Sequence, residues 1–90
     1  MKKMITRKLI STQISKLLNK EISVSDFGEE MFQYLAFDED YDYEEGYKEL
    51  IMDVLDNFTQ MHDAGKENPG YKPDIPSNEK LIELRDLLNK

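Results

Sequence analysis

The sequence contains no cysteine and only one histidine, so it lacks both a disulfide framework and the usual ligands of a structural zinc site. A chain of 90 residues without disulfides depends on a small hydrophobic core, which suits a reducing compartment. Apolar runs are short, and none approaches the roughly 20 residues that span a bilayer. The residues after Met1–Lys3 include Thr6 and Arg7 rather than an uninterrupted apolar signal core. We therefore expect one soluble, cytoplasmic domain.

Motifs of enzymatic chemistry are also missing. The sequence has no Gly-rich phosphate loop and no H-E-x-x-H pair, and the single imidazole, His62, stands beside Asp63 near the expected end of a helix. A protonated imidazole there is stabilised by the helix dipole, and we favour this structural role over catalysis. We expect no enzymatic activity and no cofactor.

Basic residues are almost absent from the middle of the chain. Residues 1–20 carry six Lys or Arg and no acid, residues 21–63 carry 14 acids against Lys48 alone, and residues 64–90 carry five of each. The formal net charge is -7. Such a chain repels phosphate backbones and attracts basic protein surfaces. We expect a basic protein partner, with no binding of nucleic acid or membrane.

The basic first segment has two alternative interpretations, a membrane-surface helix or an organelle presequence. Its apolar stripe, however, lacks Trp and Phe, and the acidic block that follows offers its bases neutralising neighbours within the fold. We therefore interpret it as an ordinary core helix.

Apolar residues recur with helical spacing in four segments, and no segment shows a convincing strand alternation. Ser23 and either Ser77 or Asn78 are suitable N-caps, whereas Gly65 suits a helix end and the Pro-containing residues 66–76 suit a loop. The predicted fold is an all-α, compact, four-helix bundle-like single domain of residues 1–90. Its predicted helices cover about residues 4–20, 24–37, 44–63 and 78–89.

Residues 38–45, the acidic segment, hold six carboxylates in eight positions, and repulsion predicts a loop or frayed helix end. Asp38-x-Asp40-x-Asp42 with Glu49 matches four ligand positions of an EF-hand calcium loop. Tyr43, however, replaces the glycine of the sharp turn, no second loop exists, and such an acidic run fits the template by composition alone. We predict no metal site, while a degenerate calcium-binding module or an acidic adaptor remains the alternative function.

Tyrosines interleave with these carboxylates, and tyrosine supplies a large contact area with a polar tip in protein interfaces. The alternative is that one or two rings cover the core, with Tyr47 the best core candidate by its helical position. The predicted partner-binding residues comprise the acidic segment, its flanking tyrosine and two acids of the third helix: Asp38, Glu39, Asp40, Tyr41, Asp42, Tyr43, Glu44, Glu45, Tyr47, Asp53 and Asp56.

In layout the chain resembles the small acidic helical immunity proteins that bacteria make against their own nuclease toxins, namely the E-type colicin, colicin D and contact-dependent-inhibition groups. Leu17–Phe27 resembles their I-S-x-x-x-F junction between the first two helices, and residues 49–61 followed by 68–73 resemble their long helix and Pro-containing loop. Of the D-L-I-Y-Y-P motif of the E-type group only Tyr71 and Pro73 have counterparts. The resemblance implies a helical bacteriocin-type immunity protein that neutralises a cognate toxin.

Overall fold

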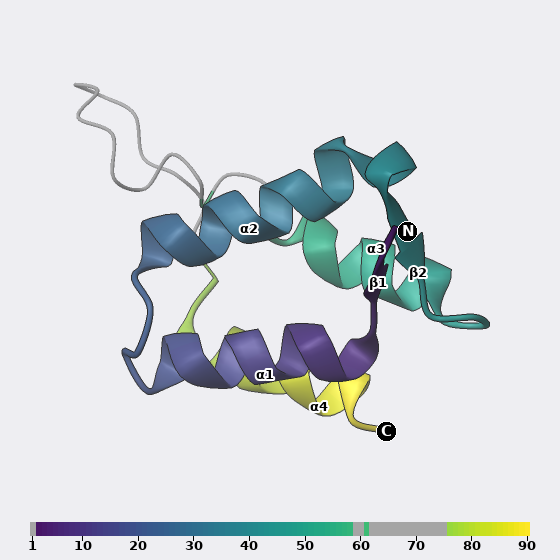
Figure 1. Cartoon of the computed structure of the whole chain (residues 1–90). Helices are drawn as coiled ribbons and strands as arrows, with labels where there is room; N and C mark the ends of the chain where they lie inside the picture. Colours follow the sequence, from purple (N-terminus) through teal and green to yellow (C-terminus); the bar gives the residue numbers. More distant parts are fainter. Residues whose placement is uncertain (1, 59–60, 62–75) are drawn as a thin grey trace.

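The computed structural model describes residues 2–58, 61 and 76–90, which form four helices, one 3-10 turn and a small sheet (Figure 1). In chain order these elements are β1 (Lys3–Ile5), α1 (Arg7–Leu18), α2 (Val24–Ala36), η1 (Asp38–Asp40), β2 (Tyr41–Tyr43), α3 (Lys48–Asp56) and α4 (Asn78–Leu88). The protein is therefore mostly helical, and the expectation of four helices agrees with the structure. The expectation that it contains no strand is wrong.

The helices lie in two layers. Helices α1 and α4 run side by side in opposite directions, and α2 and α3 lie across from them (Figure 1). The two strands close one end of these layers, where the start of the chain meets the connection between α2 and α3.

The core lies between the layers and is built from the periodic apolar stripes of the sequence. Phe27 of α2 packs edge-to-face on Phe58, with ring centroids 4.9 Å apart. The buried apolar residues are Ile5, Ile10, Ile14, Leu17, Phe27, Met31, Tyr34, Ile51, Val54, Leu55, Phe58, Met61, Leu81, Leu84 and Leu88. Ile5 and Tyr34 aside, these residues belong to the stripes from which the helices were predicted.

Hydroxyl side chains fix the beginnings of three helices. Ser23 accepts from the backbone N–H of Asp26 at 3.0 Å, and Ser77 accepts from that of Lys80 at 3.2 Å. The sequence predicts the first cap, and Ser77 is one of the two candidates, Ser77 and Asn78, that it offers for the second. A third cap was not predicted: Thr6 accepts from the N–H of Leu9 at 3.0 Å and begins α1 three residues later than expected.

The residues before this cap form a strand instead of a helical turn. Lys3–Ile5 pairs in parallel with Tyr41–Tyr43, with Lys3 opposite Tyr41 and Ile5 opposite Tyr43. Ile5 is fully buried, whereas Met4 is 51% exposed. The strand was missed because three residues are too few to show an alternating pattern.

The acidic segment is also more ordered than predicted, since it contains η1 and β2. Backbone pairing with β1 and the half-buried rings of Tyr41 and Tyr43 hold its second half against the core. Helix α3 consequently begins at Lys48 and not at Glu44. The N–H of Glu44 donates to the carbonyl of Ile5 at 2.9 Å, and Gly46 adopts a left-handed φ of 84°, which glycine tolerates without strain.

Within the described residues α3 ends at Asp56, earlier than expected, and Phe58 and Met61 continue its buried stripe. The predicted roles of His62, Gly65, Tyr71 and Pro73, and of the loop as far as residue 75, fall outside the described residues. No helix in the described part of the chain is long and apolar enough to cross a membrane.

Candidate protein-binding surface

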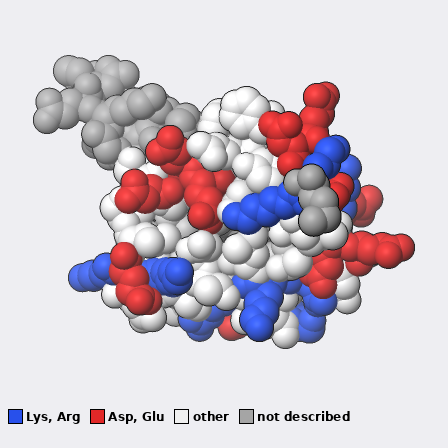
Figure 2. Space-filling view, in the orientation of Figure 1, with Lys and Arg blue, Asp and Glu red and all other residues white. Residues whose placement is uncertain are grey.

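The acidic side chains of the described residues are displayed mainly by α2, the acidic segment and α3. Glu39 and Asp40 are exposed on η1, Asp42 is exposed on β2, and Glu45 is exposed in the turn before α3. Figure 2 shows acids gathered over α2 and, together with some Lys or Arg, at the strand end of the molecule, whereas Lys and Arg are prominent along the side where α1 lies. The chain therefore presents a negative surface, as its charge blocks predict.

The tyrosines of the acidic segment do not stand free among these carboxylates. Tyr41 and Tyr43 are half-buried and pack against the core, and Tyr41 meets the ring of Tyr34 edge-to-face at 5.1 Å. The hydroxyl of Tyr43 donates to the backbone carbonyl of Tyr34. These two rings chiefly fasten β2 to α2, which is the alternative that the sequence left open.

Tyr47, in contrast to Tyr41 and Tyr43, is more exposed than the sequence predicts. We expected it to be the best core candidate, but it is the N-cap residue of α3 and is 37% exposed. The guanidinium carbon of Arg7 lies 3.5 Å from its ring centroid, within the range of a cation–π contact. The assignment to the core is wrong because the helix begins one residue after Tyr47, so the stripe of α3 does not include it.

Glu44 is engaged inside the protein rather than presented to a partner. Its Oε1 accepts from the Nε of Arg7 at 3.0 Å and its Oε2 from Nη2 at 3.1 Å, while the backbone N–H of Arg7 also donates to Oε1 at 3.1 Å. These hydrogen bonds hold the pKa of Glu44 below its ordinary value and raise the pKa of Arg7. Arg7 also donates to the carbonyl of Lys90 at 3.1 Å and so links the acidic segment to the end of α4.

Lys3 of β1 is a second basic residue that makes contacts within the fold. The ammonium of Lys3 donates to the hydroxyl of Tyr34 at 3.0 Å, and this hydrogen bond raises the pKa of Lys3. Burial raises the pKa of Tyr34, so the phenol is neutral at ordinary pH. Glu30 lies nearby, with Oε1 3.5 Å from the Nε2 of Gln13 and Oε2 buried without a hydrogen-bond partner in the described part of the chain. Two bases of the first segment, Lys3 and Arg7, thus have acidic and aromatic neighbours within the fold.

A shallow, open recess of about 360 Å³ lies beside β2. It is lined by Lys2, Glu39, Tyr41, Asp42, Tyr43 and Lys48. Two acids face two bases across it, and Lys48 also lies 5.7 Å from the ring centroid of Tyr43. Lys2 and Lys48 therefore partly offset the charges of Glu39 and Asp42 at this part of the surface.

The remaining predicted contact residues, Asp53 and Asp56, lie on α3. Asp53 and Asp56 are exposed, and with Glu49 they follow the i, i+4, i+7 spacing of one helical stripe. The EF-hand spacing does not produce a metal cluster: Asp42 lies on a paired strand, Glu49 lies in the first turn of α3, and the described residues include no group of three acidic, His or Cys side chains placed to hold an ion. The side chain of Asp38 is not among those described.

Sequence reasoning missed one exposed residue on this surface. Phe37 ends α2 immediately before the acidic segment and is 54% exposed. The sequence placed Phe37 at the end of a predicted helix, and we gave it no role there. The signal that could have found it is that this Phe lies just outside the apolar stripe of the helix.

Comparison of the chain with protein-family models, with curated proteins and with solved structures finds no match.

Proposed function

We propose that this chain is an immunity protein that binds a cognate bacterial nuclease toxin and neutralises it by covering its basic substrate surface. The observation that carries the proposal is the negative surface, defined here by the exposed carboxylates of η1, β2 and α3: Glu39, Asp40, Asp42, Asp53 and Asp56. A nuclease must bind phosphates with Lys and Arg, so its substrate surface attracts such a face. The inhibitor then acts sterically and needs no catalytic group.

Charge and apolar contacts have different roles in this proposal. Carboxylates steer the partners together before contact and reject partners of the wrong charge. Residence time depends instead on desolvated contacts near the centre of the interface. The colicin nuclease–immunity pairs that the chain resembles are a standard example of very tight association.

The proposal is tested by co-expression with the product of an adjacent toxin gene. We expect this chain to protect the cells from the toxin, to copurify with it, and to abolish its cleavage of nucleic acid. A chain in which Glu39, Asp40 and Asp42 are all changed to Lys should lose protection, whereas reversal of the α4 acids Glu79 and Glu83 should not. Failure of the wild-type chain both to bind and to protect would contradict the proposal.

A further inference from the structure

The backbone holds Phe37 in a fixed position at the end of α2. Its N–H donates to the carbonyl of Gln33 at 3.0 Å, and its own carbonyl accepts from the N–H of Asp40 at 2.9 Å. Both polar groups of the residue are therefore hydrogen-bonded, one into the helix and the other into η1. The ring, which is 54% exposed, is presented on a constrained turn and not on a free loop.

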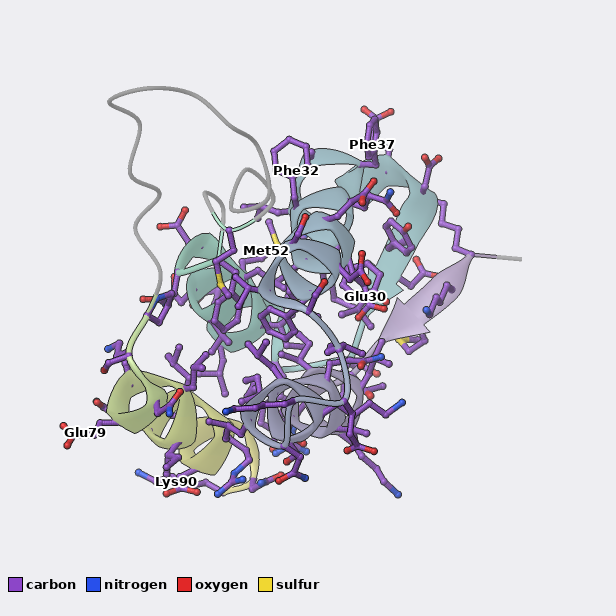
Figure 3. The ribbon with its side chains drawn as sticks, turned by 90° about the vertical axis from the view of Figure 1, so that its left-hand side faces the viewer. Glu30, Phe32, Phe37, Met52, Glu79 and Lys90 are labelled. Atoms are coloured by element: carbon purple, nitrogen blue, oxygen red, sulfur yellow. The ribbon has the colours of Figure 1, made fainter. Side chains whose placement is uncertain are left out.

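Exposure distinguishes Phe37 from the other described phenylalanines. Phe27 and Phe58 are 1% and 0% exposed, and Phe32 is half-buried. Figure 3 shows Phe32 and Phe37 projecting from the same side of α2, away from α1 and α4. About half of the surface of Phe37 therefore remains exposed, and a partner that covers it would gain apolar contact area.

Acidic residues flank Phe37 in the sequence. Glu39 and Asp40 are exposed on the turn that directly follows Phe37, and residues 21–47 hold ten acids and no base. An aromatic centre with a charged rim is the usual arrangement of a protein interface. The same rim disfavours anionic membranes, and it disfavours a second copy of this chain docked through the same acidic face, because like charges repel.

We propose that Phe37 is the apolar anchor of the negative surface, and that it inserts into an apolar pocket rimmed by Lys and Arg on a basic protein partner. The inference rests on the proposed function, because it names the contact through which the same surface binds. It replaces Tyr41 and Tyr43 as anchors, since those rings pack against the core. An arginine of the partner can also stack on the face of the exposed ring.

The test is an NMR titration of the whole ¹⁵N-labelled chain with a Lys- and Arg-rich peptide that carries a single Trp. We expect the largest amide shifts in residues 33–43 and weaker binding by about ten-fold for Phe37→Ala. Replacing the Trp of the peptide by Ala should weaken binding similarly, and replacing its bases by Glu should abolish binding.

Ile82→Ala is the matched control, because Ile82 is an exposed apolar residue, 40% exposed, on α4. Both variants should keep the wild-type circular dichroism spectrum and melting temperature, and Ile82→Ala should bind the peptide as the wild type does. The inference is overturned if the wild type does not bind, if shifts lie elsewhere, or if Phe37→Ala binds normally. Self-association lost in Phe37→Ala would assign the surface to a second copy and also overturn it.

The two proposals fail separately. If the peptide binds at Phe37 but the chain gives no protection against the adjacent toxin, the immunity function fails and the anchor stands. If the wild type protects and Phe37→Ala protects and binds the toxin equally well, the anchor fails and the immunity function stands.

Discussion

Tyr43 shows how one side chain can join two elements that are separated by a turn. Its ring packs against the core, and its hydroxyl donates to the carbonyl of Tyr34 in the last turn of α2. The last four carbonyls of a helix have no partner within the helix. Tyr43 therefore satisfies one of them and ties β2 to α2.

We expect Tyr43→Phe to lower the free energy of unfolding by about 1 kcal/mol, because it removes the hydroxyl donor and keeps the packed ring. Asp42→Ala is the control on the same strand, since Asp42 is exposed. It should change stability by no more than about 0.5 kcal/mol. Urea denaturation followed by circular dichroism measures both, and equal stability of Tyr43→Phe and wild type would show that the hydrogen bond contributes nothing.

The Arg7–Glu44 pair predicts a dependence of stability on pH. The pKa of Glu44 is lowered in the folded state, so folding favours the ionised carboxylate. The contribution is present above the pKa of an unfolded glutamate, about 4.3, and is lost as the pH falls through the lower folded value. We expect acid to destabilise the wild type more than Glu44→Gln over this range. Parallel pH titrations of the two would contradict this, and thermal melts from neutral to acidic pH make the comparison.

At the scale of elements, the sheet is the feature that organises the candidate surface. Backbone pairing of β1 with β2 fixes the acidic segment against the core, and Ile5 anchors the pair because its side chain is fully buried. Side-chain contacts of Tyr41, Tyr43 and Glu44 add to this pairing and offset the repulsion between the carboxylates of the segment.

Truncation of the Ile5 side chain should show that the position of the acidic segment depends on the sheet. We expect Ile5→Ala to destabilise the protein by about 2–5 kcal/mol through loss of buried contacts and formation of a cavity. Met4→Ala, in the same strand but 51% exposed, should have little effect. Hydrogen exchange provides a local measurement: the Glu44 amide, which donates to Ile5, should lose protection in Ile5→Ala and keep it in Met4→Ala.

At the scale of the whole molecule, charge is unevenly distributed: acids gather over α2 and at the strand end, and Lys and Arg are prominent along the side where α1 lies (Figure 2). Long-range steering depends on this uneven distribution and acts before contact. It is screened over a Debye length of about 8 Å at physiological salt.

The rate of association with a basic partner should depend on which acids are reversed. Reversal of Glu39, Asp40 and Asp42 to Lys should slow association with a basic partner and flatten its salt dependence, with less change in the dissociation rate. Reversal of Glu79 and Glu83, exposed acids of α4, provides a charge control for that surface. Stopped-flow measurements at two salt concentrations compare the variants, and equal effects of the two reversals would show that net charge alone matters.

Calcium should have little effect on the protein. The acids of the EF-hand-like spacing are divided between a turn, a paired strand and a helix. We expect millimolar calcium to shift the melting temperature only slightly, and Asp38→Ala and Glu49→Ala to leave that shift unchanged. A micromolar dissociation constant that both variants abolish would instead support a calcium-binding module.

The sequence by itself determined most of the helical framework. The stripe through Ile10, Ile14 and Leu17 and the caps Ser23 and Ser77 are local signals, because residues three or four apart share a helix face and a cap bonds within its own first turn. The block arrangement of charge likewise predicted a negative surface, since it follows from composition. These features required no knowledge of which distant segments meet.

Only the tertiary structure decided how the acidic segment is used. The pairing of Ile5 with Tyr43 and the hydrogen bonds between Arg7 and Glu44 join residues nearly forty positions apart, which local periodicity does not encode. The same contacts turned the rings of Tyr41 and Tyr43 inward, delayed the start of α3 and placed Tyr47 outside its stripe. Phe37 was left exposed because burial is set by the elements that cover a residue, and η1 turns the chain away immediately after it.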